Sequence, residues 1–242
     1  MTDQTTQEIG LSPPATRPLG TGERIYAVVW LCDLRDSTRL CESMPVEDFL
    51  QLLNDFFDCT AGAVRDHGGR ILTYIGDAAL AVFPIEGHDK SLQEACTLEE
   101  GACTAALAAA RAARERLDTL NARRSSRGEP ALRFVLALHV GDVMYGNIGV
   151  QERHHATVIG SAVNEAARLT ELCKDLDRWI LISSAIPPCF PEQVASIGRH
   201  RLRGLKGEHE VFTLVGERVG SGPAGGPGRE HDAGDDQGTA DG

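Results

Sequence analysis

The chain has 242 residues, of which 42% are hydrophobic, and this is enough for one medium-sized domain with a substantial core. Its formal net charge of −11 disfavours binding to nucleic acid or to an anionic membrane surface, so we expect neither as a partner. The seven cysteines form no C-x-x-C pair and the N-terminus carries no signal segment, so we expect reduced thiols and a cytoplasmic location.

Composition divides the chain into three regions. Residues 1–22 are polar and contain three prolines, which predicts a flexible leader. Residues 23–216 alternate apolar and polar segments and form the expected folded domain. Residues 217–242 are rich in Gly and Asp and predict a disordered tail, because they cannot bury enough apolar surface to offset the entropy of ordering.

The expected elements follow one another in a strand and helix alternation. Residues 24–34 are a β-rich apolar run, which predicts a buried strand, and 46–67 have helical spacing with Pro45 at the first turn. The later elements are strands at 70–75 and 78–83, a helix at 93–123, strands at 132–140 and 143–147, a helix at 161–175, and strands at 179–183, 196–203 and 209–215.

Two Gly-Asp pairs, Gly76-Asp77 and Gly141-Asp142, predict hairpin turns. The arginines near the end of the long helix, among them Arg124, are expected on a solvated face. The order β-α-β-β-α-β predicts an α+β fold with a ferredoxin-like core and C-terminal additions, in which the helices cover one face of a mainly antiparallel sheet.

Two carboxylates are expected to meet at one rim of this sheet. Asp33 ends the first strand, and Asp77 lies at the tip of the hairpin that can pair with it. Two neighbouring carboxylates repel each other, and divalent cations between them would remove that cost. Oxygen ligands favour Mg²⁺ or Mn²⁺, so two such ions are the expected cofactors.

Three further segments carry groups suited to a phosphorylated ligand. The first follows Asp33, where a helix start offers backbone N–H groups to phosphate. It consists of Leu34, Arg35, Asp36, Ser37 and Thr38. In the second, Asn164 and Arg168 are spaced i, i+4 on one helix face. The third is a basic turn at Lys206. Each segment alone has an ordinary structural explanation, such as a helix cap or a solvated face.

Taken in order, these segments resemble the catalytic domain of class III nucleotide cyclases, the family of adenylate and guanylate cyclases. The matching stretches are WLCDLRDSTRL, YIGDAALAVF, LALHVGDVMYGNIG, TVIGSAVNEAARL and LKG, between residues 24 and 216. The resemblance implies metal binding by Asp33 and Asp77. It also implies that Asn164 orients the ribose, that Arg168 stabilises the transition state, and that Lys206 holds the terminal phosphates.

The resemblance further implies a head-to-tail homodimer with two equivalent sites, in which one copy supplies the metal carboxylates and the other supplies Asn164 and Arg168. The substrate would be a nucleoside triphosphate. One departure from the family is Asp36, which adds negative charge to the phosphate-binding segment where many relatives have glycine.

The base-selecting positions of the family fall on Thr73 and Thr157. Adenylate cyclases have Lys at the first, and guanylate cyclases typically have Glu; Thr at the second fits one bacterial adenylate pattern. Thr73 fits neither purine pattern, because it supplies neither a cation for adenine nor a carboxylate for guanine. Its hydroxyl can donate or accept a hydrogen bond, so the position is permissive. Three alternatives stay open: a pyrimidine cyclase acting on UTP or CTP in antiphage defence, whose product reaches a downstream effector; an adenylate cyclase with a relaxed pocket; and a catalytically silent nucleotide-binding dimer.

Overall fold

The computed structural model describes residues 22–85, 92–150, 153–186 and 193–216. Its elements are β1 (Gly22–Leu34), α1 (Ser37–Glu42), α2 (Val46–Asp66), β2 (Arg70–Ile75), β3 (Ala78–Pro84), α3 (Leu92–Ser125), β4 (Phe134–Val150), β5 (Arg153–Ile159), α4 (Ser161–Asp175), β6 (Ile180–Ser183), β7 (Val194–His200) and β8 (His209–Leu214). Apart from Gly22, the expected leader (1–22) and tail (217–242) lie outside the described residues, so both stay predictions.

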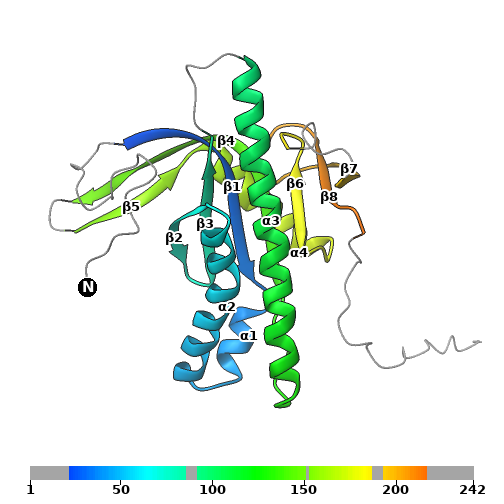
Figure 1. The fold of residues 1–242 in the computed structure, drawn as a ribbon. Coiled ribbons are helices and arrows are strands. Elements are labelled where there is room, and N and C mark those ends of the chain that lie inside the picture. Colours follow the sequence, from blue (N-terminus) through cyan, green and yellow to red (C-terminus); the bar gives the residue numbers. More distant parts are fainter. Residues whose placement is uncertain (1–21, 86–91, 151–152, 187–192, 217–242) are drawn as a thin grey trace, which may run out of the picture.

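The described strands form one sheet in the order β2-β3-β1-β4-β6-β8-β7, with β5 paired to β4 (Figure 1). The β4–β6 pair is parallel and the other pairs are antiparallel. This confirms the α+β class and the strands and helices expected for the core.

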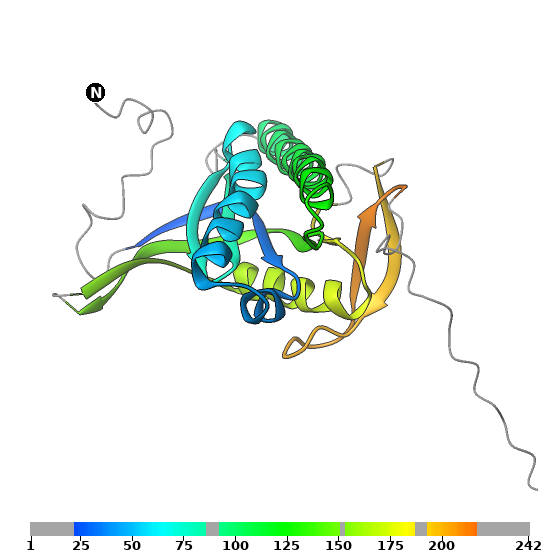
Figure 2. The ribbon, with the colours of Figure 1, turned by 90° about the horizontal axis from the view of Figure 1, so that it is seen from below.

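Helices cover both faces of the sheet, so the expectation of helices on one face is wrong. Trp30 and Cys32 of β1 pack in the cluster that contains α2 and α3, whereas Val29 and Leu31 pack in the cluster that contains Ala166 of α4. Figure 2 shows α2 and α3 on one side of the sheet and α4 on the other. The reason lies in β1, whose successive side chains point to opposite faces and are apolar on both, so that both faces must be covered.

The expected turn at Gly76-Asp77 is confirmed, but the one at Gly141-Asp142 is wrong. Gly76 has a φ of 62°, which glycine adopts without strain, and it connects β2 to β3. Gly141 instead pairs with Ala27 inside the unbroken strand β4. A Cβ at Gly141 would lie 2.9 Å from the Cβ of Ala162, so glycine is needed there for the close approach of α4. The hairpin that follows connects β4 to β5.

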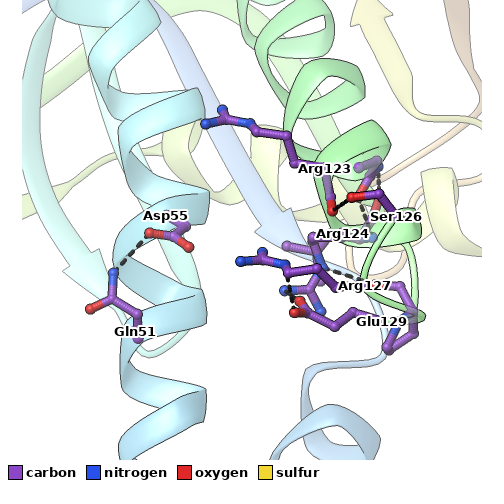
Figure 3. A network of polar contacts seen from close by, with 10 residues as sticks. Gln51, Asp55, Arg123, Arg124, Ser126, Arg127 and Glu129 are labelled. Carbon is purple, nitrogen blue, oxygen red and sulfur yellow. Dashed lines mark hydrogen bonds and ion pairs between the residues drawn. The ribbon is translucent and has the colours of Figure 1, made fainter.

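The end of α3 is held in place by the buried side chain of Arg124. The prediction that the arginines near this end all lie on a solvated face is therefore wrong for Arg124. The Arg124 side chain donates from Nε to the Pro130 carbonyl at 3.0 Å and pairs with Glu129 at 3.0 Å. Figure 3 shows Glu129 between Arg124 and Arg127. Asn121 adds hydrogen bonds to both the N–H and the carbonyl of Leu132. These contacts hold the segment that leads into β4 at the rim where the candidate site lies.

Candidate active site

The two expected metal carboxylates come from adjacent parts of the sheet. Asp33 is the penultimate residue of the central strand β1 and pairs with Ala78, the first residue of β3. Asp77 precedes Ala78 in the β2–β3 turn, and its carbonyl lies 3.4 Å from the N–H of Leu34. Strand pairing on both sides of β1 therefore holds the two carboxylates at one rim.

The electrostatics of this rim favour a cation. Burial raises the pKa of Asp33, and the neighbouring Asp77 acts in the same direction, whereas the ammonium group of Lys174 opposes the shift. A raised pKa means that the surroundings disfavour the charged carboxylate. Bound cations would reverse that preference, and two aspartates are the hard oxygen ligands that Mg²⁺ and Mn²⁺ take.

No group of three or more His, Cys, Asp or Glu side chains in the described part of the chain could hold a metal ion. The rim offers the pair Asp33 and Asp77, and this suits ions that keep several water or phosphate ligands. The residues present thus fit a metal that arrives with a nucleotide better than a closed structural site.

Lys174 is a rim residue that the sequence analysis did not identify. It lies in the last turn of α4, and its ammonium group makes an ion pair with the Asp33 carboxylate. The two residues are 141 positions apart, so only the packing of α4 against β1 brings them together. No local motif marks this lysine; a basic residue in the last turn of a helix is common.

The segment expected to bind phosphate follows Asp33 directly. Asp36 has a φ of 59° at the start of α1, a left-handed conformation that aspartate tolerates. Its carboxylate pairs with Arg133 at 3.2 Å, so the extra negative charge of this departure from the family is met by a cation. Arg35 is engaged elsewhere, because its guanidinium pairs with Asp177 at 2.7 Å. Arg133 was not anticipated from the sequence.

The expected pair on α4 lies about two to three helical turns before Lys174. Asn164 and Arg168 precede Lys174 by ten and six residues, which is about 15 Å and about 9 Å along the helix axis. The residue of α4 that contacts Asp33 of the same chain is Lys174, whereas Asn164 and Arg168 lie toward the other end of the helix. Asn164 is exposed, and Arg168 pairs with Glu171 at 2.7 Å.

Lys206 lies in the turn between β7 and β8 and is exposed. Its carbonyl lies 3.2 Å from Nε2 of His209, and Nδ1 of that ring lies 3.8 Å from the Glu165 carboxylate. The turn that carries Lys206 is therefore tied to the residue next to Asn164. These contacts associate Lys206 with the N-terminal half of α4.

The two positions expected to select the base, Thr73 and Thr157, lie on β2 and β5. Thr73 is half-buried, and its hydroxyl donates to the carbonyl of Tyr74 at 3.3 Å. Tyr74 belongs to the opposite face and packs on Phe57 of α2, with ring centroids 4.5 Å apart. Thr157 pairs with Gly146 in the ladder, and its side chain lies outside the described residues. Strands β2 and β5 are in contact within one chain.

The amino-acid sequence matches the family model of the adenylate and guanylate cyclase catalytic domain over residues 25–216. Among curated proteins, Rv1318c of Mycobacterium tuberculosis is 39% identical over 190 residues, which are 77% of this chain and 32% of that protein. A second protein of that organism, Rv1319c, is 33% identical over 178 residues, or 74% of this chain and 30% of its own length. The chain thus spans about a third of the length of these relatives.

Solved structures agree on the fold. The adenylyl cyclase CyaB from P. aeruginosa has a TM-score of 0.68 at 22% identity, covering 82% of this chain and 97% of CyaB. The guanylyl cyclase Cya2 has a TM-score of 0.65 at 25% identity, covering 83% of this chain and 95% of Cya2. Similar structures thus include enzymes of both purine types. In the described residues, no helix is long and apolar enough to cross a membrane.

Proposed function

Because the chain belongs to the family of adenylate and guanylate cyclase catalytic domains, we propose that it converts a nucleoside triphosphate to its 3′,5′-cyclic monophosphate and pyrophosphate. We propose further that two copies form the site together. The observation that carries this second point is the distance between the two sets of functional groups in one chain. Lys174 touches Asp33, so Asn164, about 15 Å further along α4, needs a second copy to meet a metal rim.

A head-to-tail homodimer would have two equivalent sites. Each would combine Asp33 and Asp77 of one copy with Asn164 and Arg168 of the other. Exposed apolar side chains on neighbouring strands support such an interface, since large exposed apolar groups commonly mark protein contacts. They are Ile75 of β2, Met144 of β4 and Ile159 of β5, with 59%, 39% and 52% of their surface exposed.

In the proposed reaction, the ribose 3′-oxygen forms a bond to the α-phosphorus, and the bond from that phosphorus to the oxygen bridging to the β-phosphate breaks. Pyrophosphate leaves with the electron pair, and the hydroxyl proton passes to water. Two divalent ions, Mn²⁺ or Mg²⁺, would lower the pKa of the 3′-hydroxyl and offset phosphate charge when bound. The remaining contribution of the protein is positioning and charge neutralisation.

Each proposed side chain has a role that its chemistry suits. Asp33 and Asp77 would hold the metal ions, and the Asn164 amide would orient the ribose. The planar cation of Arg168 would stabilise charge that develops on the α-phosphate, and its removal should slow the reaction by about 10²- to 10³-fold. Lys206 would hold the terminal phosphates, and the backbone of residues 34–38 would bind phosphate as well.

The base that we propose is a pyrimidine, from UTP or CTP, because Thr73 supplies neither the cation nor the carboxylate of the purine enzymes. The cyclic product would then serve as a messenger in antiphage defence and act through a downstream effector. One residue favours the alternative of ATP: Thr157 fits a bacterial adenylate pattern. A silent nucleotide-binding dimer is the third candidate, and the retained acidic, amide and basic groups argue against it.

The test is to incubate the purified protein with each of the four nucleoside triphosphates separately, with Mn²⁺ or Mg²⁺, and to identify the products by mass spectrometry. We expect cyclic product from UTP or CTP. Product from ATP alone would contradict the pyrimidine assignment. If none of the four nucleoside triphosphates gave a cyclic product, the proposal that the protein is a cyclase would be wrong. The matched control is Asp77→Ala, which should abolish turnover while the dimer persists on a sizing column.

A further inference from the structure

The ion pair between Lys174 and Asp33 places a fixed cation at the carboxylate proposed to bind metal. The Lys174 side chain is 44% exposed and that of Asp33 is 21% exposed, so the pair is partly accessible to solvent and does not lie deep in the core. In the absence of metal, the ammonium group offsets the charge of a carboxylate that burial and Asp77 both disfavour.

The ammonium group of Lys174 is suited to being replaced at the carboxylate by a metal ion. The chain has three lysines and 21 arginines, and the residue at this position is one of the three lysines. An ammonium group is a compact point charge on a flexible chain, whereas a guanidinium group binds a carboxylate through a planar fork. A lysine can therefore pair with a carboxylate that a metal ion would bind, and can leave it by rotation of its own side chain.

Anchoring of α4 does not explain the pair. The helix is held to the sheet by its buried residues Ala162, Ala166, Leu169 and Cys173, which belong to one apolar cluster with β1 and β4. Lys174 follows this face and projects its charge toward Asp33. A partly exposed ion pair adds little to a helix that is already packed in this way.

We propose that Lys174 is a resident counter-ion that competes with divalent metal for Asp33, so that free metal binds weakly and a second charge partner, the nucleotide phosphates, favours loading. The inference rests on the proposed function, because it takes Asp33 as a metal ligand. An ammonium group and a divalent cation cannot share the same carboxylate oxygen without strong repulsion. Metal binding at that oxygen, Oδ2 of Asp33, therefore requires Lys174 to move away.

The proposal is tested with Mn²⁺ alone, without nucleotide, by the loss of the electron paramagnetic resonance signal of free Mn²⁺ as it binds. Lys174→Met keeps the length of the side chain and removes the charge. It should bind Mn²⁺ about two- to fivefold more tightly than the unchanged protein, the scale of one partly exposed ion pair. Lys174→Gln provides a second neutral variant should the first fail to fold, and Lys174→Arg should bind Mn²⁺ no more tightly than the unchanged protein.

Two controls separate this inference from the proposed function. Arg65→Met removes an 81% exposed cation from α2 and should leave Mn²⁺ affinity unchanged. Asp33→Asn should remove the Mn²⁺ site that the lysine variants strengthen. Equal or weaker Mn²⁺ binding by both neutral Lys174 variants, with the Asp33 dependence intact, would overturn the counter-ion and leave the metal site standing. If Asp33→Asn left Mn²⁺ binding unchanged, both the counter-ion role of Lys174 and the metal site at Asp33 would be wrong.

Discussion

The strongest prediction concerns activity restored by mixing two inactive variants. Asp77→Asn should remove a proposed metal ligand, and Arg168→Ala should remove the proposed transition-state cation of α4. Each change should lower turnover by about 10²-fold or more. If the sites are shared head to tail, a heterodimer of the two variants carries both lesions in one site and none in the other. Random reassociation makes half of the dimers heterodimers, so the mixture should regain about a quarter of the unchanged activity.

The assay measures cyclic nucleotide after the two variants are mixed in equal amounts and allowed to exchange subunits. A matched control mixes Asp77→Asn with the double variant that also carries Arg168→Ala, in which no chain retains Asp77 and no activity should return. Differently tagged chains, recovered together, show that exchange has occurred. If exchanged mixtures stay at background, Asp77 and Arg168 serve the same chain, and the reasoning from their separation along α4 is wrong.

Three further predictions test other groups. Thr73→Lys should shift substrate preference toward ATP, because it restores a cation at the base-selecting position; the four-nucleotide assay measures it. Burial lowers the pKa of His139 below its usual 6.5, although Glu165 opposes the shift. The unfolded chain therefore binds the proton first, and the free energy of unfolding should fall as pH drops below about 6.5, less so in His139→Asn, as urea denaturation would show. Iodoacetamide at pH 8 should modify exposed Cys41 and spare Cys32, whose pKa burial raises to about 12, as peptide mass mapping would reveal.

The strands and helices of the core are predicted from the sequence because the spacing of their apolar residues matches the faces that are buried in the structure. The apolar run in β1 and the helical spacing in α2 both match the structure, because β1 is buried on both faces and α2 buries the side that its own residues make apolar. The Gly141-Asp142 pair misleads because the same two letters that form a turn at Gly76-Asp77 here serve a different need. Only the approach of Ala162 from α4, which is tertiary, explains Gly141.

The residues of the candidate site also differ in whether the sequence alone identifies them. Asp33, Asp77, Asn164 and Arg168 stand in short motifs, so a resemblance between sequences is enough to propose their roles. Lys174 and Arg133 carry no such signal, since each acquires its partner only when distant segments pack together. Their partners are Asp33 and Asp36, two acidic residues of the rim. The motifs therefore identify the acidic residues of this rim, and the packing of distant segments supplies the cations that pair with them.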